Sequence, residues 1–139
     1  MSEQPLYQDP QGKMIDRFPN PHEDLDYQIE LQAEMFSVLD PESGKPCYAN
    51  LNFGYFPGEW CVEHPSLALY LLSYRQERMS MEMAIGRIAK DFAEEVDPNQ
   101  LRLEATFVSR DGIAAKLIVP WPSPDEEEDD EFDQEDLRE

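Results

Sequence analysis

Apolar and polar residues alternate along the chain from Tyr27 to Met35, where the odd positions are apolar and the even positions are glutamine or glutamate. A period of two is typical of a strand with one buried face, so the pattern predicts a strand over 27–35. The segment 40–46, DPESGKP, supplies the proline, serine and glycine that turns require. A second alternation follows, through Ala49, Leu51, Phe53 and Tyr55. The two runs together predict a β-hairpin.

The apolar period then changes to that of a helix. Apolar residues fall three and four positions apart between Leu67 and Tyr74, and Pro65 can occupy the first turn. A second helical run begins at Met81 and continues to Phe92, with Ser80 as its expected N-cap. The pair Asp97-Pro98 ends that run. We therefore expect two consecutive helices after the hairpin.

A second hairpin closes the pattern. Alternation runs from Leu101 to Phe107, turns at residues 110–112, and resumes from Ile113 to Val119. The order strand, strand, helix, helix, strand, strand predicts an α+β fold, in which two helices cover one face of a four-stranded antiparallel sheet. Both sheet edges would stay open. Either the chain's own termini cover them, or subunits join their sheets edge to edge into a closed oligomeric barrel.

The two ends of the chain lack these periods. Residues 1–24 contain four prolines and predict an irregular arm on a domain spanning 25–121. Residues 122–139 predict a disordered acidic tail, because 125–139 alone carry eleven acidic residues and one arginine. That segment holds half of the net charge of −20. The tail is expected to act as a solubilising appendage, and the alternative is a partner-binding segment anchored by Phe132.

The charge and the cysteine content indicate which partners and which cellular location to expect. The remainder of the chain is also acidic, so it lacks the clustered lysines and arginines with which proteins grip nucleic-acid phosphates. No apolar run approaches the roughly 20 residues of a membrane-spanning helix, and the N-terminus does not resemble a secretory signal. We expect a cytoplasmic protein with no membrane or nucleic-acid partner. Cys47 and Cys61 are then expected to be free thiols.

The segment 19–75 resembles a known family. It begins PNPHEDLDYQIELQAEMFSVLDPESGKPCYAN and continues LNFGYFPGEWCVEHPSLALYLLSYR, and the similarity extends through Glu82 and Arg110-Asp111-Gly112. This segment resembles the unimodular QueF family, the NADPH-dependent 7-cyano-7-deazaguanine reductases of queuosine biosynthesis. The resemblance implies the tunnelling fold, assembly into pentamer-like rings, active sites between subunits, and a small heterocyclic ligand of the deazaguanine, purine or pterin type.

The catalytic positions implied by the resemblance are Asp40 and Cys47. In the family a nucleophilic cysteine precedes a proline at the hairpin turn, and a proton-transferring aspartate follows seven residues later. Here the two residue types are exchanged, with aspartate at 40 and cysteine at 47. A thiol adds to a nitrile far better than a carboxylate does. Cys47 would therefore be the nucleophile and Asp40 the proton-transfer group; alternatively, Cys47 is a small strand residue and Asp40 caps its own turn.

The family's cofactor motif is also altered. Its signature Glu-Ser-Lys-Ser-Leu-Lys corresponds here to residues 63–68, EHPSLA, which contain neither lysine. The resemblance places Glu63 with the substrate, and Ser66 and Arg110 with NADPH. Without the two lysines, tight binding of the cofactor's phosphate is not expected. Cys61 and His64 have a spacing that suits two zinc ligands, but the chain has only two cysteines and two histidines in total, so a full site is not expected and no metal is predicted.

Glu82 matches the family's glutamate that binds the guanine-like edge of the substrate. A carboxylate can accept two parallel hydrogen bonds from the N–H groups of a 2-aminopyrimidinone. The alternative is an ordinary glutamate in the first turn of a helix. Two functions follow from the resemblance: a nitrile reductase with exchanged catalytic residues, or a non-reducing protein of the same fold that binds a heterocycle or serves a structural role.

Overall fold

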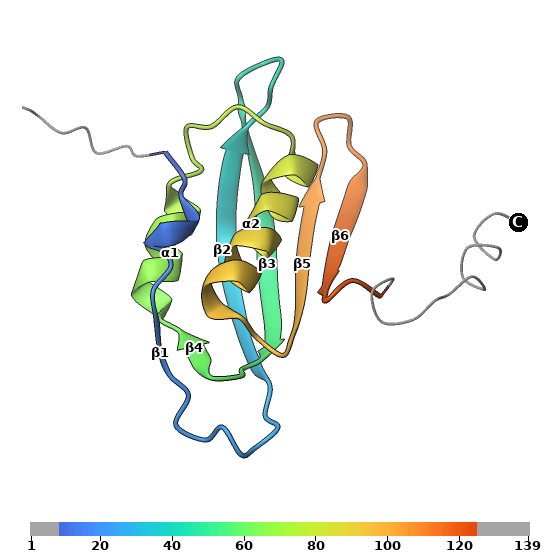
Figure 1. The fold of residues 1–139 in the computed structure, drawn as a ribbon. Helices are drawn as coiled ribbons and strands as arrows, with labels where there is room; N and C mark the ends of the chain where they lie inside the picture. The colour runs from blue at the N-terminus through green and yellow to red at the C-terminus, as the bar shows by residue number, and fades with distance from the viewer. Residues whose placement is uncertain (1–8, 125–139) are drawn as a thin grey trace, which may run out of the picture.

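The computed structural model describes residues 9–124 (Figure 1). The helices are a short 3₁₀ turn, η1 (Gly12–Met14), and two α-helices, α1 (His64–Leu72) and α2 (Met81–Val96). The strands are β1 (Arg17–Pro19), β2 (Ile29–Leu39), β3 (Pro46–Phe56), β4 (Trp60–Val62), β5 (Gln100–Val108) and β6 (Ala114–Trp121). Within the described residues no helix is long and apolar enough to cross a membrane.

The four long strands form one antiparallel sheet in the order β2-β3-β5-β6. Both predicted hairpins are present, and β3 pairs with β5 to join them. Helices α1 and α2 lie on the same face of this sheet (Figure 1). The α+β fold predicted from the periods is confirmed, with helix and strand ends displaced by only a few residues.

The core lies between this face of the sheet and the helices. In β3 the alternate residues Ala49, Leu51, Phe53 and Tyr55 are all buried, and α2 contributes Ile85, Ile88 and Phe92. The Phe92 ring packs against Phe53 and Tyr55, with ring centroids 5.3 and 5.1 Å apart. The apolar face of the strand and the apolar face of the helix, both identified in the sequence, meet here. Burying them against each other removes the most apolar surface from water.

Strand β2 departs from the predicted alternation at Met35. Its register against β3 shifts between Ala33 and Phe36, and Met35 takes a left-handed backbone conformation with φ of 65°. The Met35 side chain is 67% exposed, whereas the predicted strand placed it on the buried face. The cause is a β-bulge, in which one extra residue moves the following side chains to the other face. Phe36 and Val38 are buried instead.

The N-terminal arm is more ordered than its prolines suggest. Strand β1 pairs with β4 in a small second sheet that the sequence did not predict. The Asp16 N–H donates to Ser66 Oγ at 2.8 Å, and Arg17 stacks on Trp60 at 4.3 Å. The predicted acidic tail lies outside the described residues except for 122–124.

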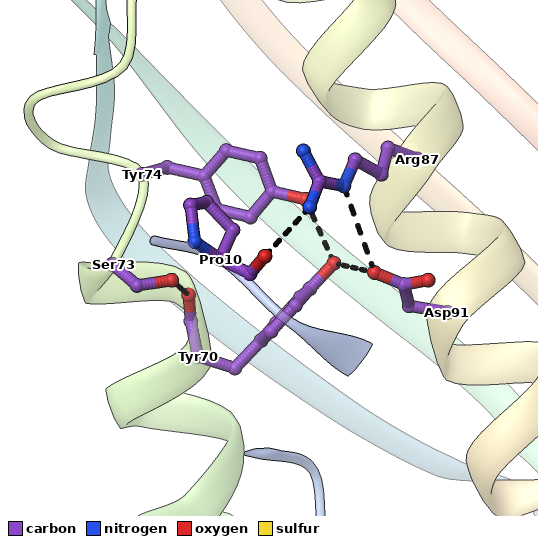
Figure 2. Close-up of polar contacts among 6 residues, drawn as sticks. All are labelled: Pro10, Tyr70, Ser73, Tyr74, Arg87 and Asp91. Atoms are coloured by element: carbon purple, nitrogen blue, oxygen red, sulfur yellow. Dashed lines mark hydrogen bonds and ion pairs between the residues drawn. The ribbon is translucent and has the colours of Figure 1, made fainter. Parts of the chain in front are cut away.

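A buried polar network fastens the arm to both helices (Figure 2). The Tyr70 O–H donates to Asp91 Oδ2 at 2.5 Å, and the Tyr74 hydroxyl lies 2.8 Å from that of Tyr70. Arg87 Nη2 donates to the Pro10 carbonyl at 2.6 Å. Burial raises the pKa of Tyr70, and it raises the pKa of Tyr74 to about 12. Both phenols therefore stay neutral at physiological pH, and Tyr74 donates to Tyr70.

We expect the substitution Tyr70→Phe to lower the free energy of unfolding by about 1–3 kcal/mol, measured by urea denaturation, because it removes a hydrogen-bond partner from both Asp91 and Tyr74 in a largely buried setting. Tyr48→Phe is the control, since Tyr48 is 49% exposed, and it should stay within about 0.5 kcal/mol of wild type. An equal loss of the free energy of unfolding in Tyr70→Phe and Tyr48→Phe would contradict a stabilising role of the network.

Candidate functional site

The β2–β3 turn is held in shape by Asp40. Its carboxylate oxygen Oδ2 accepts the backbone N–H groups of Glu42 at 3.1 Å and Ser43 at 2.8 Å. Gly44 follows with a φ of 75°, a left-handed conformation that glycine adopts without steric cost. The Arg78 guanidinium lies against Gly44 where a Cβ would project, and its Nη1 donates to the Pro41 carbonyl at 3.3 Å. The turn is therefore fixed both internally and by a side chain from outside.

A short parallel bridge joins this hairpin to the segment before α2. The Leu39 N–H donates to the Glu77 carbonyl at 2.8 Å, and the Met79 N–H donates back to the Leu39 carbonyl at 3.1 Å. Leu39 directly precedes Asp40, and Met79 lies three residues before Glu82. The bridge thus brings together two of the predicted site residues that are far apart in sequence.

Cys47 and Asp40 project from the same face of the hairpin. Cys47 lies opposite Val38 in the β2–β3 register, and the ladder continues through a 2.8 Å hydrogen bond from the Asp40 N–H to the Lys45 carbonyl. Side chains two residues apart share a face, so Asp40 is the diagonal neighbour of Cys47. Diagonal neighbours stand about 7–8 Å apart on the same face of a sheet. The Cys47 side chain is half-buried against the core.

Glu82 stands in the first turn of α2. The expected N-cap is confirmed, since the Ser80 hydroxyl accepts the Met83 N–H at 3.1 Å. The Glu82 side chain is exposed, and a carboxylate here is also stabilised by the positive end of the helix dipole.

These elements line an open cavity of about 410 Å³, a size that suits a small bicyclic ligand. Its lining comes from the hairpin turn, the start of β3, the start of α2, and the end of β5 with the turn that follows it. Four of the six predicted site residues line it: Asp40, Cys47, Glu82 and Arg110. The cavity therefore holds a thiol, a carboxylate on either side, and a guanidinium.

Arg110 and Asp40 form an ion pair, with Nη1 3.5 Å from Oδ2. The backbone N–H of Ser43 is the main cause that holds the pKa of Asp40 below its usual value, and the Arg110 charge adds to the effect. Among the described residues that line the cavity, Arg110 is the only basic one, whereas Glu42, Glu82 and Asp111 are acidic.

Glu63 and Ser66 do not line this cavity. Glu63 precedes α1, and its N–H donates to the Asp16 carbonyl at 2.9 Å. Ser66 is buried, and its hydroxyl accepts from the Asp16 N–H and donates to the Glu63 carbonyl, each at 2.8 Å. In this chain both residues fasten the N-terminal arm.

The sequence did not single out the apolar part of the wall. Met79, Met81 and Phe107 line the cavity, and Met81 is buried while the other two pack against the core. Apolar surface of this kind suits the flat face of a heterocycle. The helical period identified Met81 as a core residue, but only the fold brings Phe107 beside it. In the part of the chain that the structure describes, no three metal-ligating side chains cluster.

Comparison with known proteins shows the family to which this chain belongs. The family described as QueF-like protein matches residues 46–126. The NADPH-dependent 7-cyano-7-deazaguanine reductase of Nitrosospira multiformis is 37% identical over 121 residues, which cover 81% of this chain and 87% of the relative. The protein of the same name from Thiobacillus denitrificans is 37% identical over 108 residues, 78% of each chain. This chain belongs to the QueF-like family.

The fold also resembles that of a solved structure. The QueF-like chain superposes on the crystal structure of the archaeosine synthase QueF-Like in the apo form with a TM-score of 0.62, covering 67% of this chain and 91% of that one. The sequence identity is 13%, so this likeness concerns the fold alone. It confirms the tunnelling fold that the resemblance implied.

The turn that presents Asp40 offers a stability test in this QueF-like chain. We expect Gly44→Ala to lower the free energy of unfolding by at least about 1–2 kcal/mol, because alanine is strained at φ of 75° and its Cβ would displace Arg78. Gly86→Ala is the matched control. A Cβ on Gly86 meets nothing within 4 Å inside α2, so this change should stabilise by about 0.5–1 kcal/mol. A neutral effect of Gly44→Ala in thermal and urea unfolding would contradict the described turn.

Proposed function

We propose that this protein binds 7-cyano-7-deazaguanine in the cavity between the hairpin turn and α2, and that the Cys47 thiol adds to the nitrile. The observation that carries the proposal is the convergence of Asp40, Cys47 and Glu82 on one cavity. The relatives are named for the reduction of this nitrile, which supports the choice of ligand.

Glu82 is the recognition residue in this proposal. Its carboxylate accepts the two neighbouring N–H groups of the aminopyrimidinone edge, an arrangement that rejects adenine-like rings. The apolar wall formed by Met79, Met81 and Phe107 packs on the ring face. The nitrile, at the other end of the bicyclic ring, then points toward the hairpin.

The bond-forming step needs no outside reagent. The Cys47 sulfur attacks the nitrile carbon, the S–H proton passes through the Asp40 carboxylate, and the nitrile nitrogen receives it. The product is a thioimidate, in which S–H has been added across the C≡N bond. The Asp40 carboxylate is ionised at neutral pH, which is the form that can take up the thiol proton and pass it on to nitrogen.

NADPH supplies the hydride in the reductases that this chain resembles. Here the residues assigned to it by the resemblance do not fit a nucleotide phosphate. The Ser66 hydroxyl is buried and already bonded to backbone, and Pro65 at the start of α1 has no N–H to donate. Arg110 faces Asp40. The proposed function therefore ends at the thioimidate, and the second candidate is a protein that binds the heterocycle without forming a bond.

We further infer that subunits join edge to edge. Within the described residues β2 and β6 are the two open edges of the sheet, and open edges of this length invite pairing. Assembly would place sites between subunits, in keeping with the family resemblance, and would let Glu63 reach a neighbouring subunit's cavity. A mass in solution equal to one 16.2 kDa chain, measured by light scattering, would contradict this.

The test of the proposed function is intact-mass spectrometry of the protein incubated with 7-cyano-7-deazaguanine. We expect a mass gain equal to the whole ligand, because addition releases no leaving group. Cys47→Ala should abolish the gain, whereas Cys61→Ala should retain it, since Cys61 is buried away from the cavity. Binding without any adduct would favour the second candidate.

Recognition is tested with the same ligand on the Cys47→Ala background by calorimetry. Glu82→Gln should weaken binding about 10- to 100-fold, because the loss of a charged hydrogen-bond acceptor costs about 1.5–3 kcal/mol. Glu94→Gln is the matched control, as Glu94 is an exposed glutamate on the same helix outside the cavity. Equal affinities for the two variants would overturn the role of Glu82. Oxidation of NADPH that depends on the nitrile would overturn the proposal that the reaction ends at the thioimidate.

A further inference from the structure

The ion pair between Arg110 and Asp40 adds to a set of contacts that already hold this carboxylate. Glu42 N–H, Ser43 N–H and Arg110 Nη1 all contact the same oxygen, Oδ2. The Ser43 hydroxyl also hydrogen-bonds to the carboxylate. The hairpin turn and Arg110 together therefore fix where the carboxylate lies.

Most of the charged side chains near Asp40 are acidic, so the positive charge of Arg110 matters for the Asp40 carboxylate. The hairpin turn contributes Glu42, the start of α2 contributes Glu82, and the β5–β6 turn contributes Asp111 beside Arg110. The Arg78 side chain also reaches the hairpin turn, where it donates to the Pro41 carbonyl. Of the residues that line the described cavity, only Arg110 offsets these acidic neighbours, and its side chain is 52% exposed and reaches over from a different hairpin.

We propose that Arg110 is a positioning residue for Asp40 and not a ligand of a nucleotide cofactor. It works with the two N–H groups of the turn to hold the carboxylate at the cavity, where the carboxylate receives the thiol proton of Cys47. This inference rests on the proposed addition of Cys47 to the nitrile. It reassigns the arginine that the family resemblance places with NADPH.

The chemistry of the step explains why the position of the carboxylate matters. As the carbon–sulfur bond forms, the S–H proton moves to the Asp40 carboxylate and then to the nitrile nitrogen, so no atom is lost and nothing is oxidised or reduced. General-base catalysis depends on placement within hydrogen-bond reach. A carboxylate released from Arg110 would lose that placement and would also titrate at a higher pH, because a neighbouring cation favours its ionised form.

The experiment measures the rate of adduct formation with 7-cyano-7-deazaguanine from pH 4 to pH 9 in the full chain. Arg110→Met should slow the reaction about tenfold at pH 6 and move the acidic limb of the rate profile to higher pH. Arg110→Lys should stay within about twofold of wild type, since the observed pair is a single contact that a point charge can replace. Arg102→Met is the control: Arg102 is an exposed, ion-paired arginine of β5 outside the cavity, and its loss should leave the rate unchanged.

Two results would overturn the inference. One is an unchanged rate of adduct formation in Arg110→Met together with weaker binding of NADPH. That result would show that Arg110 binds the cofactor and does not position Asp40. The other comes from nuclear magnetic resonance titration of the Asp40 carboxyl carbon, which does not depend on nitrile chemistry. The pKa of Asp40 should rise in Arg110→Met relative to wild type, and an unchanged pKa would refute the inference even if the wild-type protein forms no adduct. A wild-type protein that forms no adduct, with the pKa of Asp40 still rising in Arg110→Met, would refute the proposed function and the proton-transfer role but not the ion pair.

Discussion

The site depends on two backbone hydrogen bonds at Leu39. Its N–H and carbonyl pair with Glu77 and Met79, at 2.8 and 3.1 Å, and so tie the end of β2 to the segment that leads into α2. On one side of this bridge stands the Asp40 turn, and on the other stand the Ser80 cap and Glu82. The opposite walls of the cavity are therefore fixed relative to each other by main chain, whatever the side chains around them do.

Under the proposed function, this geometry would allow the family's two catalytic residue types to be exchanged while both stay at one cavity. Asp40 and Cys47 occupy diagonal positions on one face of the hairpin, so a swap keeps both groups at the same cavity and reverses only the wall from which each acts. The swap also places a carboxylate where the turn supplies two N–H donors. A carboxylate there is ionised and held in place, which suits proton transfer and does not suit nucleophilic attack.

Much of the fold was predictable because its signals are local. The alternation in β3, the helical period from Met81, and the Ser80 cap each follow from residues within one or two turns of chain. The bulge at Met35 was not predictable, since it depends on the pairing of β2 with β3 and not on the alternation within β2. The three-residue strands β1 and β4 are too short to show a period, and they pair across about forty residues.

The candidate site was predictable only in part. Resemblance to the family supplied Asp40, Cys47, Glu82 and Arg110, and the fold brings these four to one cavity. The pairing of Arg110 with Asp40, and the use of the Ser66 hydroxyl by the N-terminal arm, are contacts between distant segments that no local pattern encodes. Phe107 joins the wall for the same reason, through the register of β5 beside β3.

The most direct measurement of the central claim is a crystal structure of the protein after exposure to 7-cyano-7-deazaguanine. The account predicts continuous electron density from Cys47 Sγ to the former nitrile carbon, with the aminopyrimidinone edge of the ring on the Glu82 carboxylate. A heterocycle bound in a different cavity, or one whose edge turns away from Glu82 while Cys47 stays unmodified, would contradict it.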